Sequence, residues 1–208
     1  GEKSIHAQVG IDFASESLIR SAMLLFGDLD HSSFYGGIGI DFVWFSPFIS
    51  DSAYSDSLNE ILFRPSNVPQ AVVGYVHKGF EASFTVFQAA HGSGRLRNAS
   101  QINDFAIQAS KQFDWKRVAW EVGVGYINNL KAVGGSDYRG SLNFAITDDD
   151  NRERVPAVDA YVRGSWEKFA FIVEYNGALE GCLQRSGRFE SPQALAIEGE
   201  YLKKRKKP

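Results

Sequence analysis

The segment at residues 118–129, VAWEVGVGYINN, constrains the fold of this chain more than any other. Successive side chains of a β-strand point to opposite faces of its sheet. One of the two alternating sets is bulky and apolar: Val118, Trp120, Val122, Val124 and Tyr126. The other is small, glycine-rich and carries a carboxylate: Ala119, Glu121, Gly123, Gly125 and Ile127. The segment therefore predicts a strand with one bulky apolar face and one small, partly polar face.

The same division recurs along the chain with short polar interruptions, as in an antiparallel meander. We expect about ten strands, drawn from eleven candidate segments: 4–14, 18–26, 34–45, 71–76, 80–90, 102–113, 118–129, 141–146, 157–166, 168–176 and 194–202. The period of 18–26 also suits a buried helix, and we interpret it as a strand. The stretch HKG at 77–79 predicts a tight hairpin turn in which Gly79 adopts positive φ.

Composition agrees with an all-β protein. Of 208 residues, 44% are hydrophobic and 23% are charged, which excludes a disordered chain, and the many Phe and Gly residues favour strands and bends. We see no domain boundary and treat 1–208 as one domain or a fragment of one. The single cysteine, Cys182, excludes an intramolecular disulfide framework. The start, GEKSIHAQ, lacks the features of a signal peptide, so an exported form is expected to be a mature chain or a fragment.

Two environments fit this alternation. A soluble barrel or sandwich turns its bulky face inward, whereas a membrane barrel turns that face toward lipid. The polar sets contain little lysine, because Lys78, Lys116 and Lys168 fall at turns. The longer strands match the roughly nine to eleven residues of a tilted membrane crossing. We therefore expect an antiparallel transmembrane β-barrel of the bacterial outer membrane in contact with membrane lipid. The alternative is a soluble β-barrel or β-sandwich that serves as a binding module without enzymatic activity.

The alternation along the predicted strands assigns a mostly acidic set of side chains to the lumen of such a barrel: Asp41, Glu81, Asp104, Glu121, Asp159, Arg163 and Glu174. An acidic lining favours cations or polar neutral solutes over simple anions. The segment 45–69 shows no alternation, and a loop of this length in a compact domain is usually functional or mobile. It contributes candidate constriction residues: Asp51, Asp56, Glu60 and Arg64. The alternative is an external loop with solvated charges.

Several segments resemble the siderophore porins of the LbtU type, which are bacterial outer-membrane barrels. The resemblance rests on GIDFVWFSPFISD, AVVGYVHKGFEASFTVF, INDFAIQASKQF and VGVGYINNL, covers about 35–130, and is weaker at 158–176. It implies a barrel that takes up ferric siderophores. The N-terminal coiled-coil-like region of that family is absent, and the chain ends in YLKKRKKP instead of a strand with a terminal aromatic residue. We therefore expect an incomplete barrel, with an unclosed or strained contact between the first strand, near 5–13, and the last, near 194–202.

Catalytic and metal-binding patterns are weak. The four histidines, His6, His31, His77 and His91, lie in separate segments with no pair at metal-ligand spacing, and no HExxH or GxSxG motif occurs. The acidic run at 148–150 does not match the spacing of an EF-hand loop. The net charge of −3 gives no general attraction for nucleic acid, and the basic run at 203–207 is interpreted as a solvated tail. We therefore predict no enzymatic activity, no metal, no cofactor and no nucleic-acid partner.

Overall fold

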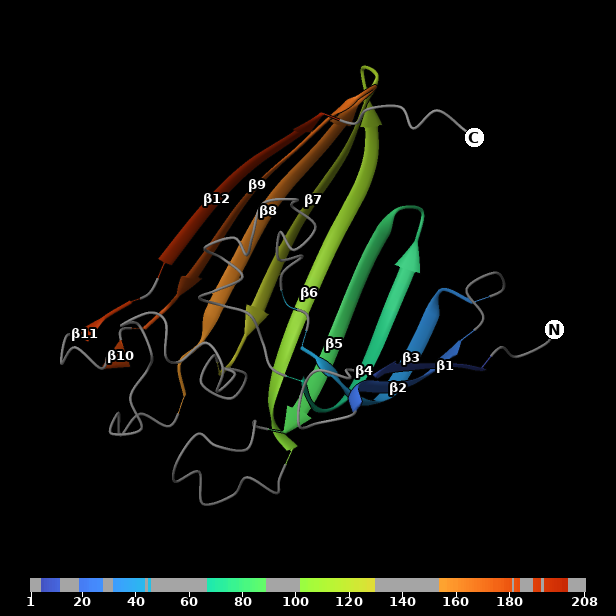
Figure 1. Cartoon of the computed structure of the whole chain (residues 1–208), viewed down its shortest axis with the longest axis vertical. Coiled ribbons are helices and arrows are strands. Elements are labelled where there is room, and N and C mark those ends of the chain that lie inside the picture. The colour runs from blue at the N-terminus through green and yellow to red at the C-terminus, as the bar shows by residue number, and fades with distance from the viewer. Residues whose placement is uncertain are drawn as a thin grey trace.

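Strands make up all the regular structure of the described part of the chain. The computed structural model describes residues 5–11, 19–27, 32–43, 45, 67–88, 102–129, 154–180, 182–183, 189–191 and 193–201 (Figure 1). The all-β, antiparallel character predicted from the alternation is confirmed. The segment at 18–26, whose period also suited a helix, contains a strand. The strand expected at 141–146 lies outside the described residues.

Ten strands form one antiparallel sheet in the order β1-β2-β3-β4-β5-β6-β7-β8-β9-β12. Neighbours in the sheet are therefore neighbours in the chain, apart from the short pair β10 and β11 between β9 and β12. That pair lies in the region of 181–192, where alternation fails. The strands are β1 (Ile5–Ile11), β2 (Ile19–Gly27), β3 (Phe34–Phe42), β4 (Asn67–His77), β5 (Phe80–Gln88), β6 (Ile102–Trp115), β7 (Val118–Ile127), β8 (Ala157–Trp166), β9 (Phe169–Ala178), β10 (Cys182–Leu183), β11 (Phe189–Glu190) and β12 (Gln193–Tyr201).

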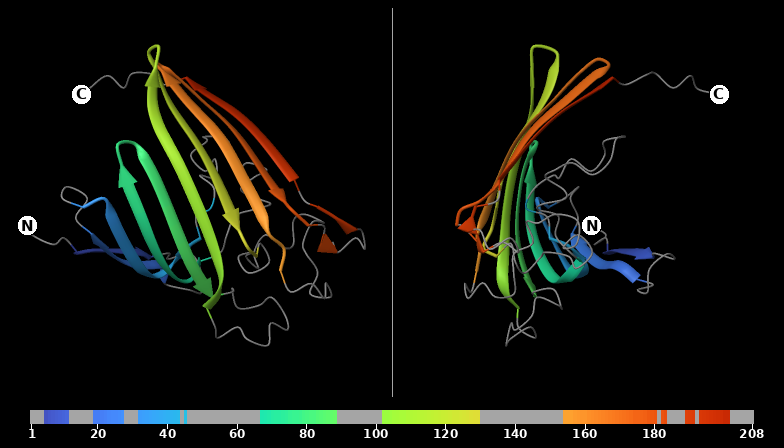
Figure 2. Two further views of the ribbon diagram at one scale, coloured as in Figure 1. Left: turned by 180° about the vertical axis from the view of Figure 1, so that it is seen from behind. Right: turned by 60° about the vertical axis from the view of Figure 1, so that its left-hand side comes forward.

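The ten-stranded sheet is not closed. Strands β1 and β12 lie at opposite sides of the sheet in Figure 1, and within the described residues each pairs with one neighbour only, β2 and β9. Figure 2 shows that the sheet is twisted and curled, so that β1 and β2 turn away from the plane of β6 to β9. The expectation of an unclosed contact between first and last strands is therefore confirmed.

Tight turns join the central hairpins. Lys78 and Gly79 adopt φ of 48° and 74° between β4 and β5, as predicted for Gly79. Lys116 and Arg117 adopt φ of 56° and 88° between β6 and β7. Two successive residues with positive φ are typical of the type I′ turn, whose twist matches that of a hairpin. The turn between β6 and β7 forms this geometry without glycine, which costs conformational energy at both positions.

The two faces of the sheet differ in chemistry. We call the face bearing Ile38, Val73, Phe84, Val124 and Ile197 the outer face. These apolar side chains are all exposed, as are many others on the same face: Leu24, Phe26, Ile40, Ile107, Phe113, Val162, Phe171, Val173, Tyr175 and Leu195. The buried side chains of the described strands lie on the opposite, inner face. The sheet is therefore most apolar on the side that the described chain leaves uncovered.

An apolar cluster lies on the inner face at the end of the sheet away from the β6–β7 turn. Phe45, Phe87, Ile127 and Val155 are fully buried in it. Phe45 follows β3 but lies directly over Gly125 of β7, where a Cβ atom would overlap the Phe45 carbonyl oxygen. The chain therefore crosses the inner face from β3 to β7 immediately after β3 ends. Glycine at position 125 makes this close approach possible.

Candidate functional site

A band of polar side chains crosses the inner face next to the apolar cluster. The strand registers place Glu81 opposite Ser110, Ser110 opposite Gly123, Gly123 opposite Tyr161 and Tyr161 opposite Glu174. One row of the sheet thus runs from β5 to β9 with a carboxylate at each end. Because side chains alternate between faces, every member of this row belongs to the inner face.

Glu121 of β7 lies at the centre of the band and connects three strands. Its Oε1 accepts a 2.7 Å hydrogen bond from the Tyr161 hydroxyl of β8. Its Oε2 accepts a 3.3 Å hydrogen bond from the Gln112 side-chain amide of β6. Both donors are neutral, so they orient the carboxylate without cancelling its charge. Neither of these two hydrogen bonds therefore places a cation on Glu121.

Glycine residues create the space in which these tyrosines lie. The Tyr161 ring covers Gly123 and the Tyr35 ring covers Gly74, since a Cβ atom on either glycine would overlap the ring. The same order of residue types occurs across three strands at both places, as Tyr35–Gly74–Ser83 and as Tyr161–Gly123–Ser110. A tyrosine over a cross-strand glycine is thus a repeated element of the inner face.

Tyr35 also binds a carboxylate. Its hydroxyl donates a 3.1 Å hydrogen bond to Oε1 of Glu81, across the width of β4. This pair is exposed, whereas Tyr161 is only 4% exposed. The two Tyr–Glu pairs therefore present similar chemistry at different depths of the inner face.

The most deeply buried carboxylates of the band lie on β8 and β9. Glu174, Asp159 and Asn176 have 0%, 2% and 0% of their surface exposed. The Asn176 side-chain amide donates a 3.1 Å hydrogen bond to Glu174 Oε1. Asp159 pairs with Asn176 in the register of β8 and β9. Carboxylates at this depth are costly unless they are hydrogen-bonded or paired.

Asp104 differs from the other acids because it joins structural elements. It is 4% exposed, forms a 3.4 Å ion pair with Arg154 Nε and accepts a 3.2 Å hydrogen bond from the Asn128 amide. The Asn128 side-chain oxygen in turn accepts a 2.7 Å hydrogen bond from the backbone of Phe105. These contacts fasten the end of β7 to the start of β6, and among the described residues the ion pair with Arg154 distinguishes Asp104 from Glu121, whose two hydrogen-bond donors are neutral.

The residues predicted to line a lumen share one face of the sheet. Registers and parity place the whole set on the inner face: Asp41, Glu81, Asp104, Glu121, Asp159, Arg163 and Glu174. Arg163 is exposed and lies opposite Glu121. The candidate constriction residues Asp51, Asp56, Glu60 and Arg64 lie outside the described residues.

Sequence reasoning missed the neutral donors and the crossing segment. The neutral donors belong to the alternating positions on the polar face of their strands: Tyr35, Gln112, Tyr161 and Asn176. Their role depends on which strands pair and in what register. An aromatic residue among polar and charged ones was the available signal for Tyr161. Nothing local in the sequence indicates that Phe45 contacts Gly125, because that contact joins β7 to residues that follow β3.

The described residues contain no group of three or more His, Cys, Asp or Glu side chains arranged to hold a metal ion. Nor do they contain a helix long and apolar enough to cross a membrane. Comparison with protein-family models, curated protein sequences and solved structures finds no match to this chain. The clearest functional features of the described chain are the two chemically different faces of its sheet.

Proposed function

We propose that the chain forms the wall of a transmembrane β-barrel channel of the bacterial outer membrane. One observation carries the proposal: strand after strand exposes large apolar side chains on the outer face while the inner face carries carboxylates. Soluble monomers rarely expose apolar patches larger than a few hundred Å². In a membrane barrel the same surface faces lipid, and small or polar side chains face the lumen.

The proposal requires that the free edges of β1 and β12 be paired in the membrane. Unpaired backbone N–H and C=O groups cost several kcal/mol each in hydrocarbon, so an open sheet edge is not stable there. The two edges then pair with further strands or with one another. This requirement separates a membrane barrel from a soluble sheet, whose edges can be hydrated.

The acids of the inner face suggest the class of solute. Glu81 and Glu121 are held by neutral donors, so their charges attract cations and polar solutes with hydrogen-bond donors. The resemblance to siderophore porins supports a ferric siderophore as one such solute. We propose a transport function rather than a catalytic one.

The second candidate is a soluble β-barrel or β-sandwich binding module. It is favoured by the fully buried apolar cluster of Phe45, Phe87, Ile127 and Val155, because a soluble β protein buries its core on one face of the sheet. In that case the exposed outer face would need another protein surface to cover it.

Flotation of the purified chain with lipid vesicles distinguishes the two candidates. A membrane barrel requires detergent for purification, floats with the vesicles and resists extraction by alkaline carbonate. A folded monomer in detergent-free buffer that stays at the bottom of the gradient contradicts the membrane proposal. Single-channel recording of the inserted protein then tests transport, and a reversal potential in a KCl gradient should show preference for K⁺.

A further inference from the structure

One cation interrupts the apolar outer face. Among the described side chains of β3 to β9 and β12, Lys111 is the one Lys, Arg, Asp or Glu whose strand position places it on that face. It lies on β6 between Phe80 of β5 and Val122 of β7. Charged residues are rare on the lipid-facing surface of a barrel and are functional-site candidates by default.

Lys111 has a backbone partner but no described carboxylate partner. Its Nζ donates a 2.6 Å hydrogen bond to the carbonyl oxygen of Lys78, in the turn between β4 and β5. An ammonium group has three N–H donors, so this bond leaves two for a ligand. The carbonyl fixes the position of the charge without neutralising it. An anion is therefore the ligand whose chemistry fits.

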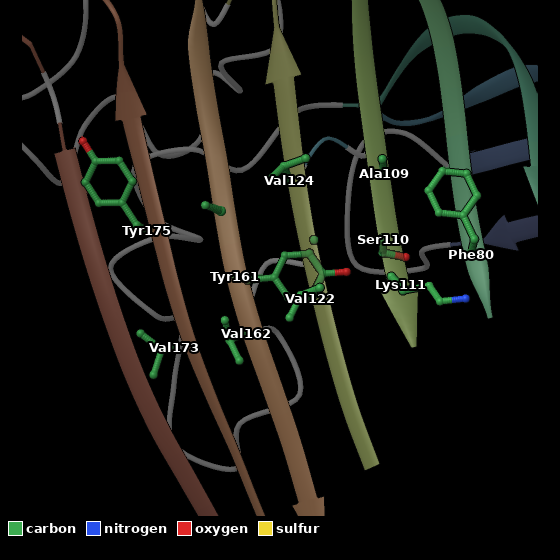
Figure 3. A pocket seen from close by; sticks show the side chains of 12 residues that line it. Phe80, Ala109, Ser110, Lys111, Val122, Val124, Tyr161, Val162, Val173 and Tyr175 are labelled. Atoms are coloured by element: carbon green, nitrogen blue, oxygen red, sulfur yellow. The ribbon is translucent and has the colours of Figure 1, made fainter. Parts of the chain in front are cut away.

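An apolar groove of about 510 Å³ lies beside Lys111 on the outer face (Figure 3). Its floor consists of small and β-branched side chains, Ala109, Val122, Val124, Ala160 and Val162, and Phe80 and Tyr175 lie at its two ends. Lys111 is the charged residue among those that line it. Ligand sites of this volume are typically apolar with a few polar groups that orient the ligand.

The groove is hollow because bulkier residues flank it. Toward the β6–β7 turn, Trp120 packs edge-on against Phe171 at 5.5 Å, over Gly164. On the other side, Ile107 lies opposite Tyr126 in the register of β6 and β7. Between these bulky residues, the outer face of β6 to β8 carries alanine and valine, which form the groove. The ammonium group of Lys111 lies at the end of the groove nearest β5.

We propose that this groove binds one acyl chain of an anionic phospholipid whose phosphate pairs with the Lys111 ammonium group. The inference rests on the proposed membrane location, because the outer face meets phospholipid only in a bilayer. A phosphate satisfies the free ammonium donors, and the apolar groove accepts the hydrocarbon that follows it. Phosphatidylglycerol is the simplest probe with this chemistry, and phosphatidylcholine with the same acyl chains is its net-neutral counterpart.

Native mass spectrometry of the full chain in detergent tests the site by counting retained lipids during titration. We expect one phosphatidylglycerol to bind more tightly than phosphatidylcholine. Lys111→Gln should weaken the phosphatidylglycerol affinity about five-fold, the effect of one cation near an anionic surface, and Lys111→Arg should retain it. Lys168→Gln, in the distant β8–β9 turn, is the charge control and should have no effect.

A second pair of variants tests the groove. Ala160→Phe fills the floor of the groove and should abolish tight binding of phosphatidylglycerol. Ala71→Phe places the same ring on the outer face of β4, outside the groove, and should leave this binding unchanged. Flotation with vesicles, measured for every variant, reports membrane insertion and folding separately from lipid selectivity. Insertion with equal retention of both lipids, unchanged by Lys111→Gln, overturns the lipid site and leaves the membrane proposal standing. Failure of the unmodified chain to insert overturns both.

Discussion

The Tyr161 hydroxyl donates a 2.7 Å hydrogen bond to Glu121 Oε1 from above Gly123, which lies opposite Tyr161 in the sheet. The bond joins β8 to β7 and fixes the carboxylate over the inner face. It exists because glycine leaves the space for the ring. Glu121 is therefore a preorganised charge on the glycine-rich face of β7.

Tyr161→Phe removes this donor while keeping the ring over Gly123. Hydrogen bonds to charged groups contribute about 1.5–3 kcal/mol, so the free energy of unfolding should fall by up to that amount. Urea unfolding followed by tryptophan fluorescence measures the change. Tyr35→Phe is the matched control, because its bond to Glu81 is exposed and 3.1 Å long, and its effect should be smaller. An equal loss in both variants would show that burial does not strengthen the Tyr161 bond.

Gly125→Ala should destabilise the fold, because the new Cβ atom would overlap the Phe45 carbonyl oxygen. The obstacle is backbone and cannot rotate away, so we expect a cost of about 1–3 kcal/mol, as for overpacking in a core. Gly199→Ala is the control, since its Cβ would meet nothing closer than the Ala170 carbonyl oxygen at 4.0 Å. Its effect should stay within about 0.5 kcal/mol. If both variants unfold at the same urea concentration, Phe45 does not pack on β7.

The strands and their faces could be predicted because alternation is local. Residues 157–166 were expected to form a strand, and β8 has the same bounds. The sequence could not predict the registers that bring Tyr35 to Glu81 and Tyr161 to Glu121, because strand pairing depends on which strands meet in space. The crossing of Phe45 to Gly125 and the pairing of β10 with β11 are likewise tertiary features with no periodic signal in the sequence. The alternation of side chains along each strand therefore identified the acids of the candidate site. Their hydrogen-bond partners could be identified only from the structure.

Val124→Arg tests the lipid environment of the outer face. Val124 is 58% exposed, and an arginine there should impair membrane insertion by about 2–4 kcal/mol if the position lies near the middle of the bilayer. The fraction of folded protein recovered with vesicles over a urea series measures the cost. Ser165→Arg, on the inner face near the β8–β9 turn, is the control and should insert normally. Equal insertion of both variants would place the outer face outside the hydrocarbon.

Ion selectivity should follow the charges of the inner face. Glu121→Gln removes a carboxylate whose two hydrogen-bond donors are neutral, so the preference for K⁺ over Cl⁻ should weaken. Arg163→Gln removes the cation opposite it in the register and should strengthen that preference. Reversal potentials in a KCl gradient measure both. Selectivity that responds to neither substitution would mean that ions do not pass this part of the inner face.

Deletion of Ser52–Asn59 tests whether the segment 45–69 narrows the channel. The segment starts at Phe45, which lies over Gly125 on the inner face, and the deletion removes the candidate constriction residue Asp56. Single-channel conductance should rise because the pore widens, and cation preference should weaken because a carboxylate is lost. Deletion of 132–139, which has equal length, controls for loop shortening and should change neither quantity. If the Ser52–Asn59 deletion also leaves both unchanged, this part of the segment lies outside the conduction path, and Asp56 does not set the selectivity.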